Sequence, residues 1–133
     1  MLPENIKNKN IDLQEIHSLS VDDKLYYLDE MMLIDNVDEY CDFICSLIED
    51  EDKGVRNASA MVITSKKPTE APAKLAPFIS SNKIQIRNLV GEVLIKVGED
   101  VIDPLIEYSI GKNDDDQKFI IDIFGMIDRK SVV

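Results

Sequence analysis

The stretch Ile86-Arg87-Asn88-Leu89-Val90-Gly91-Glu92-Val93-Leu94 decides the predicted fold, because similar stretches lie on both sides of it. Upstream by 31 residues, residues 55–63 read Val-Arg-Asn-Ala-Ser-Ala-Met-Val-Ile, with Arg56 aligned to Arg87. Downstream by 30 residues, residues 117–124 read Gln-Lys-Phe-Ile-Ile-Asp-Ile-Phe, with Gln117 aligned to Arg87. A repeat period of about 20–50 residues is typical of stacked repeat proteins. The sequence therefore predicts a row of similar units.

Each of these stretches carries apolar or small residues two, three, six and seven positions after the Arg position. Spacings of three and four place such residues on one face of a helix. A single helical pair cannot bury this stripe alone, whereas stacked neighbours can. The predicted buried stripes are Leu89, Val90, Val93 and Leu94; Ala58, Ser59, Val62 and Ile63; and Phe119, Ile120, Ile123 and Phe124.

The pattern predicts one domain over residues 1–133, built from helical pairs at 37–67, 68–98 and 99–128. The second helices are expected at 53–65, 84–97 and 116–127, and the first pair begins with a helix at 38–49. Pro77 lies inside the second pair's first helix and should kink or shorten it. Residues 129–133 resemble residues 98–102, so we expect a further helix to begin there.

Residues 10–36 fit the repeat only as a degenerate cap pair that covers one end of the stack. Ser20 followed by Asp23 predicts the start of a helix that continues through Leu33. The preceding residues 1–9 are polar, and we expect them to be frayed or loosely docked.

The composition favours a globular helical protein, with 44% hydrophobic residues and only five prolines and five glycines. The formal charge of −11 at pH 7 disfavours nucleic acid and anionic membranes as partners and favours a basic or neutral protein segment. No signal-peptide-like or membrane-spanning stretch is evident, and there are only two cysteines. These features predict a cytoplasmic protein.

The chain resembles the HEAT-repeat family in residues 52–60, in the stretch 86–94 and in residues 114–125. The resemblance covers about residues 37–133 and implies an all-α, right-handed superhelix of antiparallel helix pairs, with the second helices on the concave side. Members of this family mostly act as protein-binding scaffolds. The third repeat departs from the family pattern, because Gln117 stands where Arg is expected.

The resemblance implies that Arg56 and Arg87 are structural and pair with acidic residues of a neighbouring turn, Asp50 or Asp52 in the case of Arg56. A fork of guanidinium donors suits such carboxylates. The alternative is a basic stripe that binds a carboxylate or phosphate. That alternative predicts that Arg87→Ala abolishes partner binding without changing the melting temperature.

The candidate binding surface lies one, five and nine positions after each Arg position, and it would form the floor of the concave side. Mixed polar side chains with exposed methionines suit a protein groove. The alternative is an ordinary solvated helix face. Besides Ser65, the candidate residues are Asn57, Met61, Asn88, Glu92, Lys96, Lys118, Asp122 and Met126.

Other sites are disfavoured by the residues present. The acidic run at 49–52 fails the calcium-loop pattern, because Val55 stands at the sixth position and Met61 at the twelfth. Acidic residues there and at 114–116 instead favour helix starts. Cys41, Cys45 and His17 are too few to close a zinc site. We therefore expect buried cysteines, no metal or cofactor, and no nucleophilic Cys–His pair.

The sequence contains no phosphate-binding loop, serine-nucleophile elbow or metal-binding helix signature. It therefore predicts a non-enzymatic scaffold or adaptor that binds a partner segment on its concave face. Two alternatives remain. The first is a bilin lyase, DNA glycosylase or other cofactor-handling protein, since some proteins resembling this family have those activities. The second is a structural piece of a longer solenoid.

Overall fold

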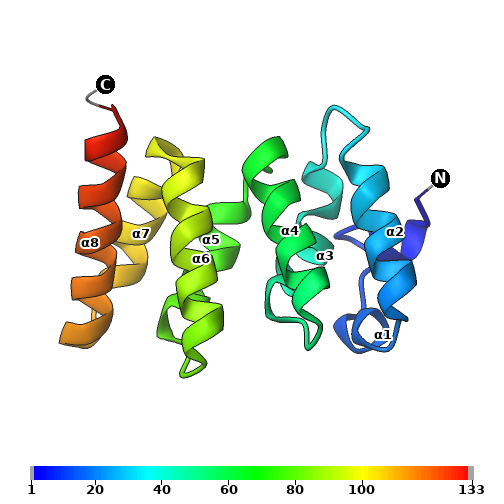
Figure 1. The fold of residues 1–133 in the computed structure, drawn as a ribbon, viewed down its shortest axis with the longest axis horizontal. Helices are drawn as coiled ribbons and strands as arrows, with labels where there is room; N and C mark the ends of the chain where they lie inside the picture. The colour runs from blue at the N-terminus through cyan, green and yellow to red at the C-terminus, as the bar shows by residue number, and fades with distance from the viewer. Residues whose placement is uncertain (1, 132–133) are drawn as a thin grey trace. The chain divides into compact units, whose positions relative to one another are not determined.

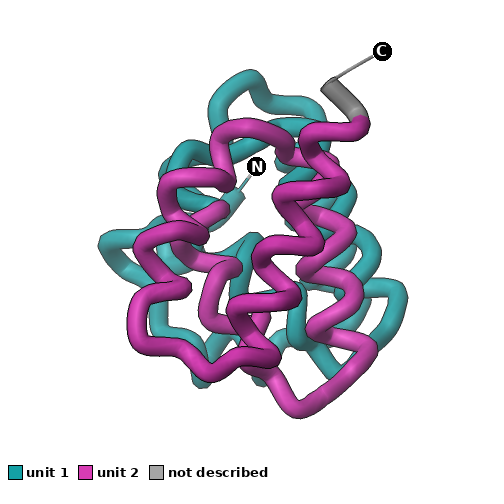
Figure 2. The backbone as a smooth tube through the Cα atoms, turned by 90° about the vertical axis from the view of Figure 1, so that its left-hand side faces the viewer, with its two compact units in different colours: residues 1–71 teal, residues 72–133 magenta. Residues whose placement is uncertain are grey.

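The computed structural model describes the backbone of residues 2–131 and the side chains of residues 2–129. All regular structure in this range is helical, so the all-α prediction is confirmed. The chain divides into two compact units, unit 1 at residues 1–71 and unit 2 at residues 72–133, which are coloured separately in Figure 2.

Unit 1 contains α1 (Leu13–His17), α2 (Val21–Met31), α3 (Cys41–Ser46) and α4 (Lys53–Lys66). Ser20 caps α2 as predicted, since its side chain accepts a hydrogen bond from the Asp23 amide. Asp52 caps α4 in the same way, through the Val55 amide. The helix predicted at 38–49 is less regular than expected, because 3₁₀ turns at Asp38–Tyr40 (η2) and Leu47–Glu49 (η3) flank α3.

Of two expectations for unit 1, one is decided between its alternatives and the other is wrong. The segment expected at residues 1–9 to be frayed or loosely docked is docked in its described part: it contains the 3₁₀ turn η1 (Glu4–Ile6), Ile6 is fully buried, and the Asn8 amide group donates to the Asp38 carbonyl. Asn8 also accepts from the Asp42 amide. Leu33 lies beyond the end of α2 and is 80% exposed, so it does not extend the buried stripe of that helix.

Unit 2 contains most of α5 (Ala71–Leu75), then η4 (Ala76–Ser80), α6 (Ile84–Val97), η5 (Glu99–Val101), α7 (Ile102–Ser109) and α8 (Asp114–Ser131). The helix before Pro77 is shortened as predicted, since α5 ends at Leu75 and a 3₁₀ turn follows. Gly98 ends α6 with a φ of 92°, a backbone conformation that glycine adopts without strain.

The last helix is longer than expected. Residues 129–131 continue α8 and do not begin a further helix, while residues 132 and 133 lie outside the described range. Asn113 accounts for the start of α8, because its side chain accepts a hydrogen bond from the Asp116 amide. The prediction of a single superhelical domain stays a prediction.

Within unit 2, α6 and α8 lie side by side and run in the same direction, and α7 lies behind them (Figure 1).

The predicted stripes form the core of both units. Leu89, Ala58, Phe119 and Phe124 are half-buried, and the remaining stripe positions are buried: Val90, Val93, Leu94, Ser59, Val62, Ile63, Ile120 and Ile123. Packing of the stripe leaves the opposite face of each second helix toward solvent.

Candidate functional site

The candidate surface of unit 2 is formed by two neighbouring helices. All six predicted residues are at least partly exposed, and Met126 has 41% of its surface accessible. We call this set the α6/α8 surface: Asn88, Glu92 and Lys96 from α6, and Lys118, Asp122 and Met126 from α8.

The corresponding residues of unit 1 lie on α4. Asn57, Met61 and Ser65 are exposed, and Met61 has 60% of its surface accessible. Each of these side chains is available for contact. The candidates on α6 and α8 therefore lie on two packed helices of unit 2, and those on α4 belong to unit 1.

Phe119 fixes how closely α8 approaches α6. A Cβ atom added at Gly91 would lie 2.8 Å from Phe119 Cζ, which is closer than real Cβ contacts. Gly91 therefore leaves the space in which the ring packs. The Arg87 guanidinium covers the same ring, with Cζ 4.5 Å from its centroid. This cation–π contact adds to the burial of the ring.

Arg87 also binds the first turn of α8. Its guanidinium lies 2.8 Å from the Asp115 carboxylate and 3.6 Å from that of Asp116, and its Nε has no hydrogen-bond partner among the described residues. Asp116 is buried and accepts a 2.6 Å hydrogen bond from the Ser80 hydroxyl. Ser80 in turn lies 2.7 Å from the Tyr108 hydroxyl. The chain of contacts thus connects α6, η4, α7 and α8.

In unit 1, Arg56 reaches the turn from which its partner was expected, but it contacts main-chain oxygens. Its guanidinium donates to the carbonyls of Asp50 (2.8 Å) and Glu51 (3.0 Å). The Asp50 carboxylate instead pairs with Lys24 at 2.7 Å, and both side chains are almost fully buried. The Asp52 carboxylate accepts from the Val55 amide. Sequence reasoning missed the Lys24–Asp50 pair.

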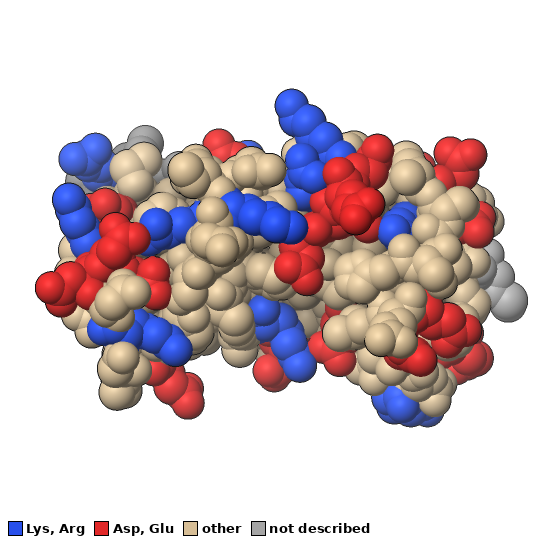
Figure 3. Space-filling view, turned by 90° about the horizontal axis from the view of Figure 1, so that it is seen from below, with Lys and Arg blue, Asp and Glu red and all other residues tan. Residues whose placement is uncertain are grey.

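The α6/α8 surface carries balanced charge, with two carboxylates and two lysines. On the face of the molecule seen in Figure 3, basic and acidic side chains are likewise interspersed. An arrangement of this kind supports polar contacts with another protein.

The cysteines are buried as predicted, with their Sγ atoms 3.9 Å apart, whereas His17 is exposed. Among the described residues, no group of three or more His, Cys, Asp or Glu side chains is arranged to hold a metal ion. In the described part of the chain, no helix is both long enough and apolar enough to cross a membrane.

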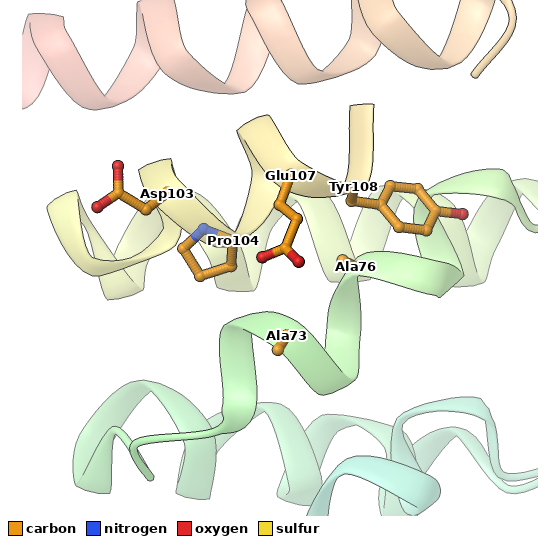
Figure 4. A pocket seen from close by; sticks show the side chains of 6 residues that line it. All are labelled: Ala73, Ala76, Asp103, Pro104, Glu107 and Tyr108. Atoms are coloured by element: carbon orange, nitrogen blue, oxygen red, sulfur yellow. The ribbon is translucent and has the colours of Figure 1, made fainter. Parts of the chain in front are cut away.

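A concave feature of unit 2 that sequence reasoning missed lies between the α5–η4 segment and α7. It is an open cleft of about 480 Å³ (Figure 4). Its lining residues are Ala73, Ala76, Asp103, Pro104, Glu107 and Tyr108.

Comparisons of the chain with protein families, with curated proteins and with solved structures gave no match.

Proposed function

We propose that this protein is a binding module whose α6/α8 surface contacts a segment of a partner protein. The observation that carries the proposal is the exposure of six mixed polar and thioether side chains on two helices that pack side by side. A rigid pair of helices presents such side chains without the entropy cost of ordering a loop. Met126 offers a polarisable apolar contact among the polar ones.

The charges favour a neutral or moderately basic partner segment. The α6/α8 surface itself is neutral, so it would pair with a segment that carries both charge signs or none. The net charge of −11 on the whole chain would accelerate the approach of a basic partner. Binding should therefore weaken as the salt concentration rises, mainly through a slower association rate.

We further infer that the helical pairs belong to a HEAT-like solenoid. This inference is supported by a feature that the predicted repeats 37–67, 68–98 and 99–128 share. Each contains a short, interrupted first helix followed by a long second helix. A crystal structure in which the pairs do not form a row with α4, α6 and α8 on one side would contradict this inference.

We also expect the module to work in a reducing compartment such as the cytoplasm, because the cysteines pack as buried thiols.

Site-specific photocrosslinking in the living source cell tests the binding proposal. A photoreactive phenylalanine analogue placed at Glu92 or at Asp122 should crosslink to one and the same partner. The matched control carries the analogue at Glu99, which is exposed and lies outside the α6/α8 surface. The partner is then purified and its affinity measured against the whole chain.

The exchange Glu92→Lys with Asp122→Lys should lower that affinity at least tenfold while the circular dichroism spectrum stays the same. Two reversed charges in one interface cost several kcal/mol of binding free energy. Equal crosslinking from Glu92, Asp122 and Glu99, or an affinity that the double exchange leaves unchanged, would overturn the proposal.

A further inference from the structure

The cleft of unit 2 exists because small side chains line one wall. Ala73 and Ala76 present only methyl groups, and Pro77 ends the α-helical geometry of that segment at Leu75. At the repeat offset of 30 residues, Ala76 corresponds to Ile106. On the other wall, Pro104 contributes a flat apolar ring from α7. The two walls therefore present apolar surface to the cleft.

The polar groups of the cleft are hydrogen-bond acceptors. The Glu107 carboxylate points into the space between Ala73, Ala76 and Pro104 (Figure 4). No other described residue forms an ion pair or side-chain hydrogen bond with it. Asp103 adds a second carboxylate one helical turn earlier on α7. A carboxylate that lacks a protein partner beside apolar surface attracts a cation.

Tyr108 also lines the cleft and is held in a fixed orientation. Ser80 has a single hydroxyl proton, which it donates to Asp116, so the Tyr108 hydroxyl must donate its own proton to Ser80. The Tyr108 oxygen is then left with acceptor lone pairs only. The ring also lies 4.4 Å beneath the Lys112 ammonium, which shows that it can accept a cation.

We propose that this cleft receives a lysine or arginine side chain from a partner protein. The methylene groups would lie against Ala73, Ala76 and Pro104, and the cationic head would meet the Glu107 carboxylate. Long basic side chains bury their stems on apolar surface in this manner while the charge stays near solvent. The cleft is lined by acceptors and the chain is acidic, so an anionic ligand would be repelled. The cleft and the α6/α8 surface are formed by different residues, so the two sites are testable separately.

The test is a titration of the whole chain, labelled with ¹⁵N, with three short peptides that differ only at their central residue. The central residue is lysine, arginine or Nε-acetyl-lysine. The basic peptides should cause saturable shifts at the amides of Ala73, Ala76 and Glu107. The acetylated peptide, which has the same stem but no charge, should cause none.

Two variants locate the binding. Glu107→Gln should weaken binding of the basic peptides by about fivefold, which is the upper range for an exposed ion pair. Ala73→Leu, at an exposed position, should fill the cleft and remove the shifts without disturbing the core. Glu99→Gln is the matched control, because it removes the same charge from an exposed position of unit 2 that belongs neither to the cleft nor to the α6/α8 surface.

Several results would overturn the proposal: no saturable shifts with either basic peptide, equal binding of the acetylated peptide, or equal loss of affinity in Glu99→Gln and Glu107→Gln. The last result would mean that the peptides respond only to net charge. Because neither Glu99 nor Glu107 belongs to the α6/α8 surface, failure of this site leaves the crosslinking test of that surface independent.

Discussion

The two units place aligned arginines in different surroundings. In unit 1, Arg56 donates to main-chain carbonyls, and the charge balance of the core is carried by the buried pair Lys24–Asp50. In unit 2, Arg87 lies on the Phe119 ring and meets two carboxylates at the start of α8. The repeat thus preserves the arginine position while the acceptors differ.

The units also differ in charge. Unit 1 has 7 basic and 16 acidic residues, a formal charge of −9, whereas unit 2 has 8 basic and 10 acidic residues, a charge of −2. Most of the long-range field of the chain therefore arises from unit 1. The proposed contact residues of unit 2 act at short range, and the acidity of unit 1 would act mainly on the association rate.

Removing the buried cation of unit 1 should have the largest effect on stability. Lys24→Met leaves the Asp50 carboxylate buried without its ion-pair partner, and such a change costs about 3–5 kcal/mol of unfolding free energy. Urea denaturation followed by circular dichroism measures this loss. Adding Asp50→Asn should restore part of it, because the amide oxygen can still accept from the Asp52 amide. A loss below about 1 kcal/mol would show that the pair is not buried in solution.

In unit 2 the substitution expected to reduce stability most acts through a steric clash. Gly91→Ala would place a methyl group 2.8 Å from Phe119 Cζ, so the ring or α8 must move. We expect a loss of about 1–3 kcal/mol, as for other overpacked cores, with faster amide exchange in α8.

Phe119→Leu completes a double-mutant cycle with Gly91→Ala, because it removes ring atoms from the space that the added methyl group would enter. The double variant should be less destabilised than the sum of the two single changes, which is the sign of contact. Strict additivity would mean that Phe119 does not pack on Gly91.

Replacing the two arginines separately tests the difference between their acceptors. Arg87→Met removes an ion pair and a cation–π contact at a partly exposed site, and should cost about 1–2 kcal/mol. Part of this cost should disappear in 1 M salt, because the Asp115 carboxylate is exposed and screened. Arg56→Met should be less sensitive to salt, since its acceptors are neutral carbonyls. Equal salt dependence of the two variants would contradict the distinction.

Much of this fold is encoded locally. The α6 boundaries at Ile84 and Val97 match the predicted range, because Gly98 ends the helix and the apolar spacing defines its face. The Ser20 cap and the break at Pro77 follow from single residues and were predicted for that reason. The exposure of the α6/α8 surface follows from the buried stripe on the opposite side of each helix.

Features that depend on distant residues were not predictable. Lys24 and Asp50 are 26 residues apart, and nothing in either local pattern indicates their pairing. The docking of residues 2–10 depends on Asn8 meeting a turn 30 residues away. The cleft requires small residues on α5 and η4 to face α7, a relation that helical periodicity does not specify. The same limit applies to Phe119 and Gly91, whose contact joins two helices.

The starts of α4 and α6 provide a matched pair of smaller effects. Asp52 caps α4, whereas Lys83 stands at the same place before α6 and makes no side-chain cap. Asp52→Ala should therefore cost unit 1 about 1 kcal/mol. Lys83→Ser should stabilise unit 2 by up to about 1 kcal/mol, because the backbone at Lys83 is already extended. Urea midpoints that shift in the same direction in both variants would contradict this difference in capping.

The smallest expected effect is an alkaline one in unit 1. The pKa of Lys7 is raised above its ordinary 10.5, first by its hydrogen bond to Glu4 and also by the nearby charge of Glu39. The pKa of Tyr26 is raised above 10.0 by the adjacent charge of Glu30. In the folded state Lys7 holds its proton more tightly than in the unfolded state. Its stabilisation is therefore complete below pH 10.5 and is lost as the pH rises through the folded pKa.

The raised pKa of Tyr26 means that the unfolded chain releases the Tyr26 proton at a lower pH than the folded chain does. The titration of Tyr26 therefore also lowers the unfolding free energy as the pH rises through this alkaline range. Unfolding free energies measured between about pH 9 and pH 12 should fall for the natural chain and fall less steeply for Lys7→Met. The matched control is Lys112→Met in unit 2, which should leave the slope unchanged, because among the described residues Lys112 contacts the ring of Tyr108 rather than a carboxylate. If Lys7→Met and the natural chain have the same slope, the contact of Lys7 with Glu4 does not persist in solution, and the docking of the amino-terminal segment depends on Ile6 and Asn8 instead.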